Sequence, residues 1–441
     1  MELQRKFYRY LLNWKAVHQH ECLLVRGARQ IGKTYIIEKF ARENYTNFIS
    51  LNFAIDPTAC EIFEGSLTAE DIYRRISAFV PEVKLIPGET LIFLDEIQEC
   101  ANARTALKPL ALDGRYDVVA TGSLLGIKYK NKRSRRKHEP RSIPVGYERS
   151  VVMYALDFEE FLWAKGVSQE ALLVLRGYFE RQEAVPEVVN RKYLDLLREY
   201  LIVGGMPAVV KTYAEERQFG SIQEEQEKIL TAYIDDIHKY ADTTDVPKIE
   251  NCYRAIPQIL SKENHKFKYA DIEKGGSERK FGASVGWLID ASLALKAEDV
   301  SVAEIPLAAH VIDDRYKLYL SDVGLLSAIF GLEFKRLLFS GQLTGNAKGG
   351  LYENFLAVEL KSKNYPLRYF KTENGASEIE YVLERDGGVV PVEVKAGNGA
   401  TISLNEFLKA ENVPYGYKFI EGNVGKIGKK VSLPHYMAMF I

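Results

Sequence analysis

Near the start of the chain stands Gly27-Ala28-Arg29-Gln30-Ile31-Gly32-Lys33-Thr34, a complete G-x-x-x-x-G-K-[ST] sequence. The pattern is typical of a phosphate-binding loop (Walker A), in which glycines let backbone N–H groups point inward around a triphosphate. In such a loop Lys33 reaches the β- and γ-phosphates, and the Thr34 hydroxyl binds Mg²⁺. Residues 22–25 read as a strand entering the loop and residues 35–45 as a helix leaving it. All eight residues are therefore predicted to bind ATP.

A second pattern supports the first. Residues 90–96, Thr-Leu-Ile-Phe-Leu-Asp-Glu, are an apolar strand that ends in two acids. We expect Asp95 to hold the Mg²⁺ shell as a Walker B acid and Glu96 to activate the attacking water as general base. The alternative is a buried strand that meets solvent at an ordinary Asp-Glu pair.

Strand and helix patterns alternate up to about residue 165, which predicts an α/β fold with a parallel sheet covered by helices on both faces. The spacing leaves room for a P-loop ATPase sheet in which a later strand, 116–120, inserts between the two motif strands. A polar residue after that strand, Thr121 or Ser123, would then contact the γ-phosphate.

Length and composition set the wider expectations. At 441 residues the chain exceeds one hydrophobic core, so we predict three domains, over residues 1–165, 166–335 and 336–441. The N-terminus lacks the apolar core of a signal peptide, and the longest uncharged apolar stretch, 201–210, is interrupted by glycines and a proline. These observations predict a cytoplasmic protein without a membrane partner.

The formal net charge of −1 excludes a globally basic nucleic-acid binder, but one segment is strongly basic. Eight of the 14 residues between Lys128 and Arg141 are Lys or Arg. A solvated loop is one interpretation. The others are a contact with the phosphate backbone of DNA or RNA and an arginine finger for a neighbouring subunit, which implies a homo-oligomer.

The region from 166 to about 310 is predicted to be mainly helical. Residues 266–296 suggest a short helix, a turn at Gly275-Gly276 and a second helix over 277–291, a layout that resembles a winged helix. Arg279 and Lys280 would lie near the start of the second helix, where a DNA contact is expected. The alternative is that this region serves packing or partner binding.

The last hundred residues predict a separate αβ unit, with a helix over 351–363, strands over 367–372, 378–384 and 389–395, and a hairpin turn at 386–388. Glu393 and Lys395 are two residues apart and so face the same side of the sheet. Together with Glu380, and with Glu353 on the helix, they are typical of a nuclease core. Carboxylates of this kind, here Glu380 and Glu393, can hold Mg²⁺ and orient a water for attack on a phosphodiester. The alternative is a set of charges on the solvent face of an edge hairpin.

Motifs along nearly the whole chain resemble one family, the prokaryotic AAA-type P-loop ATPases with a C-terminal domain of unknown function that has a restriction-endonuclease-like PD-(D/E)xK core. The resemblance is carried by residues 26–34, 94–98, 121–125, 144–146, 156–162, 204–207, 317–326 and 391–397. It implies ATP binding by residues 27–34, Asp95 and Glu96, and nuclease-type roles for Glu380, Glu393 and Lys395. The first acid of such cores is usually Asp, and Glu380 departs from that pattern, which weakens the case for an active nuclease.

Two hypotheses follow. In the first, ATP hydrolysis is coupled to a metal-dependent nuclease-like domain that acts on nucleic acid. In the second, the ATPase is a nucleotide-dependent switch, and the C-terminal fold is a degenerate nuclease used for docking a protein partner or nucleic acid. Both require Lys33 and Asp95, whereas only the first requires Glu393 and Lys395.

Overall fold

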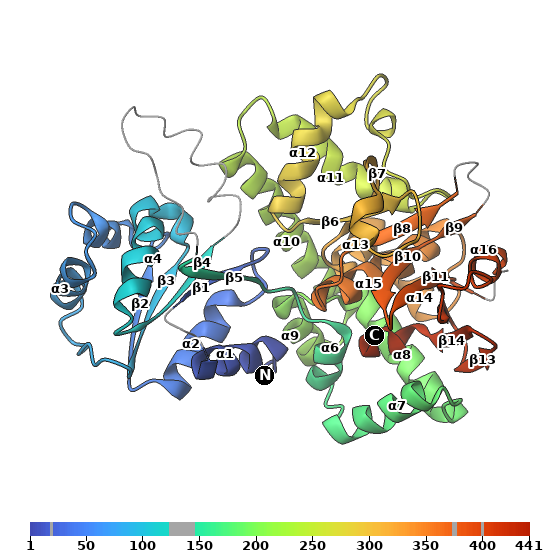
Figure 1. Ribbon diagram of the computed structural model, residues 1–441, viewed down its shortest axis with the longest axis horizontal. Coiled ribbons are helices and arrows are strands. Elements are labelled where there is room, and N and C mark those ends of the chain that lie inside the picture. Colours follow the sequence, from blue (N-terminus) through green and yellow to red (C-terminus); the bar gives the residue numbers. More distant parts are fainter. Residues whose placement is uncertain (18–20, 123–145, 373–376, 398–400) are drawn as a thin grey trace. The chain divides into compact units, whose positions relative to one another are not determined.

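The computed structural model describes residues 1–17, 21–122, 146–372, 377–397 and 401–441, which form two compact units (Figure 1). The smaller unit contains Gln4–Tyr154 and Lys239–Ala241, and the larger contains Met1–Leu3, Ala155–His238 and Asp242–Ile441. Across the described residues, none of the helices has both the length and the apolar character that a membrane span requires.

The smaller unit is built on a five-stranded parallel sheet with the order β2-β3-β4-β1-β5. Its strands are β1 (Cys22–Arg26), β2 (Asn47–Asn52), β3 (Thr90–Asp95), β4 (Asp117–Gly122) and β5 (Glu148–Val152). The predicted insertion is confirmed, because β4 lies between β1, which enters the loop, and β3, which carries the acids. The carboxyl ends of the two motif strands are thereby separated by one strand.

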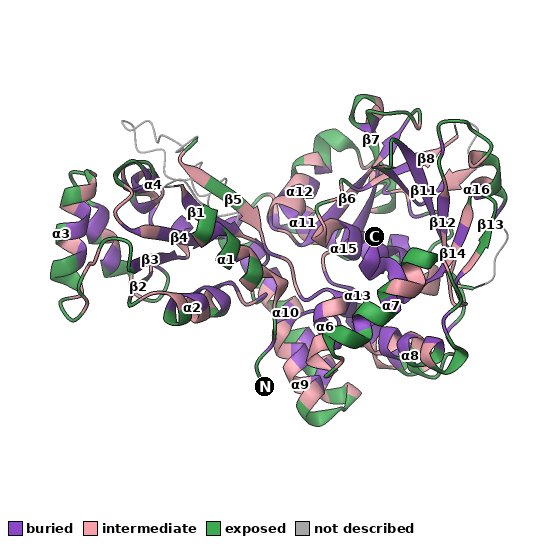
Figure 2. Ribbon diagram, turned by 60° about the horizontal axis from the view of Figure 1, so that its bottom comes forward, coloured by how far each residue is buried: buried purple, intermediate pink, exposed green. Residues whose placement is uncertain are grey.

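Helices cover both faces of this sheet. Consecutive strand residues point to opposite faces, and here both are buried, so each face must be covered. Leu24, Ile92 and Ala120 belong to one core cluster with residues of α3 and α4. Their strand neighbours Leu23 and Phe93 are also fully buried, and Figure 2 shows the central strands enclosed. The helices are α1 (Lys6–Val17), α2 (Lys33–Asn44), α3 (Ala69–Phe79) and α4 (Ala101–Asp113), with 3₁₀ turns η1 (Pro57–Phe63) and η2 (Ile97–Glu99).

The larger unit begins with helices, as predicted for the region after residue 165. They are α6 (Phe158–Ala164), α7 (Gln169–Arg181), α8 (Glu187–Val203), α9 (Pro207–Glu216), α10 (Phe219–Tyr240), α11 (Val246–Leu260) and α12 (Glu278–Asp290). The short helix expected before α12 is only a 3₁₀ turn, η3 (Tyr269–Asp271).

Two sheets complete the larger unit. One has the order β7-β6-β8-β9 and is formed by β6 (Ala294–Val300), β7 (Val311–Leu320), β8 (Arg368–Lys371) and β9 (Glu378–Ile379). The other has the order β10-β11-β12-β14-β13 and is formed by β10 (Tyr381–Arg385), β11 (Gly388–Val394), β12 (Gly416–Ile420), β13 (Gly425–Ile427) and β14 (Lys430–Pro434). The helices among them are α13 (Val323–Phe330), α14 (Leu332–Phe339), α15 (Asn346–Ser362) and α16 (Ile402–Phe407), and 3₁₀ turns η4 (Leu307–His310) and η5 (His435–Phe440) are also present.

The first sheet joins segments on both sides of the domain boundary predicted at residue 335. Strand β6 pairs with β7 in antiparallel and with β8 in parallel orientation. The middle and C-terminal segments therefore share backbone hydrogen bonds within one sheet.

Candidate nucleotide site and C-terminal carboxylate cluster

The phosphate-binding loop connects β1 to α2, and α2 begins at Lys33, earlier than the sequence pattern indicated. Its glycines adopt conformations that other residues rarely accept, since φ is +148° at Gly27 and +88° at Gly32. Space is also limited, because a Cβ on Gly27 would lie 2.3 Å from the carbonyl oxygen of Met153. Both glycines are thus required by the loop itself.

Lys33 is buried in its own loop. Its Nζ donates hydrogen bonds to the carbonyl oxygens of Gly27 at 3.1 Å and Ala28 at 2.7 Å. The ammonium group therefore points into the concave side of the loop, where phosphate oxygens are expected to bind.

Asp95 joins the loop to the acidic strand. The Thr34 hydroxyl donates to Asp95 Oδ2 at 3.0 Å, and Asn52 Nδ2 donates to the same oxygen at 2.8 Å. Asp95 Oδ1 accepts from the Thr121 hydroxyl and from the backbone N–H of Glu96 at 3.1 Å. The two residues predicted to hold Mg²⁺, Thr34 and Asp95, are thus in direct contact.

Glu96 follows Asp95 with a left-handed backbone, φ +54°. Few non-glycine residues adopt this conformation, and those that do cluster at functional sites. The Gln98 side chain donates to Glu96 Oε2. Glu96 is half-buried beside the Asp95 carboxylate, a position compatible with a general base.

Two sequence predictions for this region lie outside the described residues, namely Ser123 and the basic segment between Lys128 and Arg141. Thr121, the other candidate at the end of β4, is buried against Asp95.

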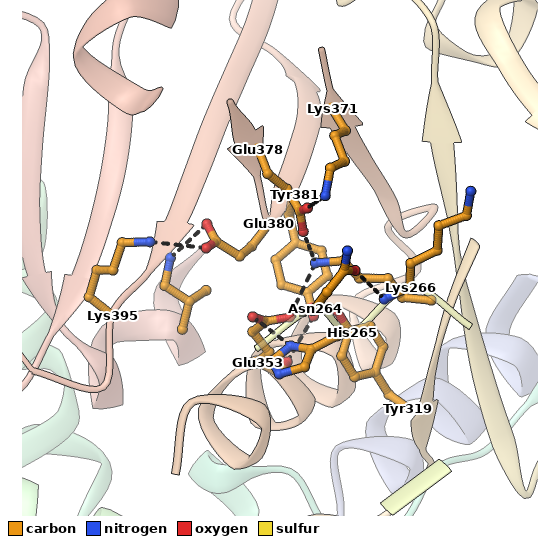
Figure 3. A network of polar contacts seen from close by, with 12 residues as sticks. Asn264, His265, Lys266, Tyr319, Glu353, Lys371, Glu378, Glu380, Tyr381 and Lys395 are labelled. Carbon is orange, nitrogen blue, oxygen red and sulfur yellow. Dashed lines mark hydrogen bonds and ion pairs between the residues drawn. The ribbon is translucent and has the colours of Figure 1, made fainter. Parts of the chain in front are cut away.

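Two C-terminal acids, Glu380 and Glu393, contact one lysine, Lys395, and Figure 3 shows Glu380 beside Lys395. Lys395 Nζ lies 3.2 Å from Glu380 Oε1 and 3.3 Å from Glu393 Oε1. Glu380 Oε2 also accepts from the backbone N–H of Val394 at 3.3 Å. Both carboxylates are buried, so the interpretation as solvated charges on an edge hairpin is wrong.

Burial sets the protonation of the cluster. It raises the pKa of Glu380 to about 7, against the opposing ammonium of Lys395, and it also raises the pKa of Glu393. Burial lowers the pKa of Lys395, but Glu380 and Glu393 outweigh that effect and the net shift is upward. Lys395 therefore remains charged between two carboxylates that resist ionisation.

Glu353 belongs to a second group, which Figure 3 shows around His265 and Tyr319. Its carboxylate lies 2.9 Å from His265 Nδ1 and 3.4 Å from Lys317 Nζ, and it accepts from the Tyr319 hydroxyl at 3.0 Å. Burial raises the pKa of Glu353, but Lys317 and His265 outweigh burial and hold it below its ordinary value. Lys317 is also paired with Glu378 at 2.6 Å.

Within the described residues, no group of three His, Cys, Asp or Glu side chains is arranged to hold a metal ion. One observation nevertheless fits a cation bound by two carboxylates and a substrate phosphate, the coordination usual for Mg²⁺. Glu393 Oε2 is buried and has no hydrogen-bond partner among the described residues. Glu380 and Glu393 thus offer oxygen ligands, provided that Lys395 moves aside.

One buried residue of the loop between β6 and β7 packs against the C-terminal segment, while most of the loop is exposed. Leu307 lies in a core cluster with Val382 and Leu404 of the C-terminal segment, and its N–H donates to Glu384 Oε1 at 2.7 Å. On α12, Lys280 is paired with Glu273, and Arg279 is exposed.

Some site residues were missed by the sequence patterns. Asn52 at the end of β2 holds Asp95, while Lys317 and His265 hold Glu353. The only available signal for Asn52 was its place at the carboxyl end of a parallel strand, where ligands of such sheets gather. Lys317 lies inside the motif at residues 317–326, but sequence spacing could not predict that it pairs with Glu353 on α15.

Comparison with known families agrees with the geometry of the smaller unit. Residues 19–162 match the family described as an AAA domain. These residues form an AAA-type P-loop ATPase domain. Residues 194–336 and 348–431 match two domains of unknown function, DUF8612 and DUF4143. The nuclease-like interpretation of the C-terminal region therefore stays a prediction. A comparison with curated protein sequences found no match to the chain.

Solved structures with similar folds include the Walker-type ATPase PABY2304 of Pyrococcus abyssi, at 15% identity over 75% of this chain and 96% of that chain, with a TM-score of 0.46. The Aeropyrum pernix Orc1 protein in complex with DNA has 11% identity over 78% and 95% of the two chains, with a TM-score of 0.32. The RuvB Holliday junction branch migration motor of Thermotoga maritima has 12% identity over 66% and 89%, with a TM-score of 0.30.

Proposed function

We propose that the AAA-type domain binds ATP with Mg²⁺ and hydrolyses it. The observation that carries this proposal is the direct contact between Thr34 of the loop and Asp95 of β3. In P-loop ATPases these two residue types hold the metal from opposite sides of the site.

The residues divide the work. Lys33 neutralises charge on the transferred phosphoryl group, and the N-terminus of α2 adds its dipole. Glu96 accepts a proton from the attacking water. When bound, Mg²⁺ polarises the phosphate oxygens, and Thr34 with Asp95 would hold it.

ATP binding and hydrolysis by three variants test the proposal. Lys33→Ala is expected to lose ATP affinity, whereas Glu96→Gln should still bind ATP but hydrolyse it at least about 100-fold more slowly, the lower range for loss of a general base. Lys39→Ala on the same helix α2 is the matched control, because Lys39 is paired with the exposed Glu43 toward the far end of the helix. Unchanged affinity in Lys33→Ala would refute nucleotide binding at this loop.

For the output of ATP hydrolysis, we infer a nuclease-like C-terminal domain that acts on or docks to nucleic acid. The cluster of Glu380, Glu393 and Lys395 supports a phosphodiester site, as does Glu393 Oε2, which has no hydrogen-bond partner in the described part of the chain. A nucleotide-dependent switch or scaffold, whose degenerate nuclease fold binds a protein partner, is the second candidate, because Lys395 already contacts both acids. Nucleic acid would reach the protein through the segment between Lys128 and Arg141 or through the exposed Arg279 on α12. Cytoplasmic location and homo-oligomerisation through an arginine finger complete the proposal.

Cleavage of single- and double-stranded DNA and RNA, with Mg²⁺ or Mn²⁺ and with or without ATP, separates the two candidates. Cleavage that is lost in Glu393→Ala and retained in Glu406→Ala, an exposed residue of α16, supports the nuclease. ATP hydrolysis without cleavage under any condition supports docking.

A further inference from the structure

One residue of the smaller unit contacts both sides of the nucleotide site from far along the chain. Tyr240 is the last residue of α10. Arg29, in the phosphate-binding loop, donates through Nη2 to the Tyr240 hydroxyl at 3.1 Å. That hydroxyl donates in turn to Glu99 Oε1 at 3.1 Å, in the turn that follows Glu96.

The groups around Tyr240 favour a tyrosine at this position. Tyr240 is buried, and burial raises its pKa, so its hydroxyl keeps the proton that it donates to Glu99. The Arg29 guanidinium carbon lies 5.6 Å from the centroid of the Tyr240 ring, and Lys239 Nζ lies 4.9 Å from it. Lys239 also lies 3.7 Å from Glu99. Cations on the ring and a carboxylate at the hydroxyl complement the two ends of a tyrosine.

Arg29 is well placed to respond to phosphate. It directly follows Ala28, whose carbonyl oxygen accepts from Lys33. When Lys33 turns to phosphate oxygens, that carbonyl loses its partner and the adjacent peptide is free to reorient. Glu99, at the other end of the link, closes η2, three residues after the predicted general base.

We propose that Tyr240 is a positioning residue of the nucleotide site, which couples Arg29 of the phosphate-binding loop to Glu99 behind the acidic strand. The inference rests on the proposed ATPase function and adds to it a residue outside the two nucleotide-binding motifs. Tyr240 ends α10, and residues 219–238 of that helix belong to the larger unit.

A double-mutant cycle tests the link. Tyr240→Phe keeps the ring and removes the hydroxyl, so we expect kcat to fall by about tenfold while KM for ATP changes little, since Lys33 and Thr34 remain. Glu99→Ala should cause a similar loss, and Glu99→Gln, which keeps an acceptor oxygen, should retain more of the rate. Adding Tyr240→Phe to Glu99→Ala should cause no further loss, because either substitution alone already breaks the link between Arg29 and Glu99. Tyr8→Phe is the control, since its hydroxyl contacts Glu43 at the far end of α2.

Hydrogen exchange gives a readout that ATP turnover does not. Nucleotide should slow amide hydrogen exchange at the C-terminal end of α10 in the wild type and in Tyr8→Phe. In Tyr240→Phe this protection should be absent, while protection of the phosphate-binding loop persists. A wild-type kcat in Tyr240→Phe, or losses that multiply in the double variant, would overturn the inference and leave the ATPase proposal intact. An inactive wild type, by contrast, would overturn the ATPase proposal itself.

Discussion

At the scale of single residues, Asp95 is the point where the nucleotide site is assembled. Its carboxylate is almost fully buried and accepts hydrogen bonds from side chains at the ends of β2 and β4 as well as from Thr34. A buried carboxylate is stable only while such donors are present. The geometry of the predicted metal ligand therefore depends on donors from three different segments of the smaller unit.

Thr121→Val tests this dependence, because valine has the shape of threonine without its hydroxyl. Loss of a hydrogen bond to a charged group should lower the free energy of unfolding of the smaller unit by about 1.5–3 kcal/mol. Chemical denaturation of the full chain measures the change. Thr105→Val, which removes only a hydroxyl bonded to the Ala101 carbonyl in α4, should change stability far less. Equal effects of the two substitutions would contradict the role given to Asp95.

Two glutamates in the C-terminal segment should respond to pH in opposite ways. Because the folded pKa of Glu380 is raised to about 7, the folded state binds more protons than the unfolded state between about pH 4.3 and 7. The destabilisation from Glu380 thus grows through that window. Relative to wild type, the melting temperature of Glu380→Gln should therefore rise from pH 5 to pH 8.

Glu378→Gln is the matched control. Burial raises the pKa of Glu378, but Lys317 and Lys371 outweigh it and the net shift is downward, so its ionised form stabilises the fold above its ordinary pKa. The variant should melt below wild type from pH 5 to pH 8, with no gain as pH rises. Parallel pH profiles for the two variants would show that the acids share one environment.

At the scale of elements, three motifs of the larger unit, at residues 156–162, 204–207 and 317–326, pack closely together; we call this contact region the joint. Asp157 and Glu160 form a capping box at the start of α6. Asp322 accepts from the N–H groups of Gly205 at 2.7 Å and Leu325 at 2.9 Å. A Cβ on Gly205 would lie 1.9 Å from the Leu156 carbonyl oxygen. The motifs at 156–162, 204–207 and 317–326 are thus explained by close backbone packing.

Gly205→Ala should therefore destabilise the larger unit by about 1–3 kcal/mol, the usual cost of overpacking, without altering ATP affinity. Thermal unfolding and a nucleotide titration of the same variant measure both. Gly220→Ala on α10, where a Cβ meets open space, is the control and should be neutral or stabilising. A loss of affinity in Gly205→Ala would give the joint a role in nucleotide binding.

The elements that sequence patterns predicted well are those defined by local signals. The loop motif and the apolar strands 90–95 and 116–120 were sufficient to predict the parallel sheet and its inserted strand. The partners of buried charges were not predictable, because they come from distant segments with no shared spacing. Glu353 is held by a lysine 36 residues away, and Arg29 by a tyrosine 211 residues away.

At the scale of the whole molecule, the larger unit is expected to fold as one piece. A fragment of residues 336–441 lacks β6, the partner of β8, and lacks the Lys317 that neutralises Glu353 and Glu378. Breaking a buried ion pair by removing one partner typically costs about 3–5 kcal/mol. We expect this fragment to be unfolded by circular dichroism and proteolysis, whereas residues 155–441 should fold. A stably folded 336–441 fragment would support the predicted boundary at residue 335.

The burial of Leu307 also bears on how such proteins diversify. A chain that acquires a new C-terminal module by recombination keeps its own β6–β7 loop, whose Leu307 packs against Val382 and Leu404 of the present module. Exchange at residue 336 would leave Leu307 facing a foreign surface. Working chimaeras of related chains should therefore have their junction before residue 294, so that the hairpin is inherited with the module that it covers.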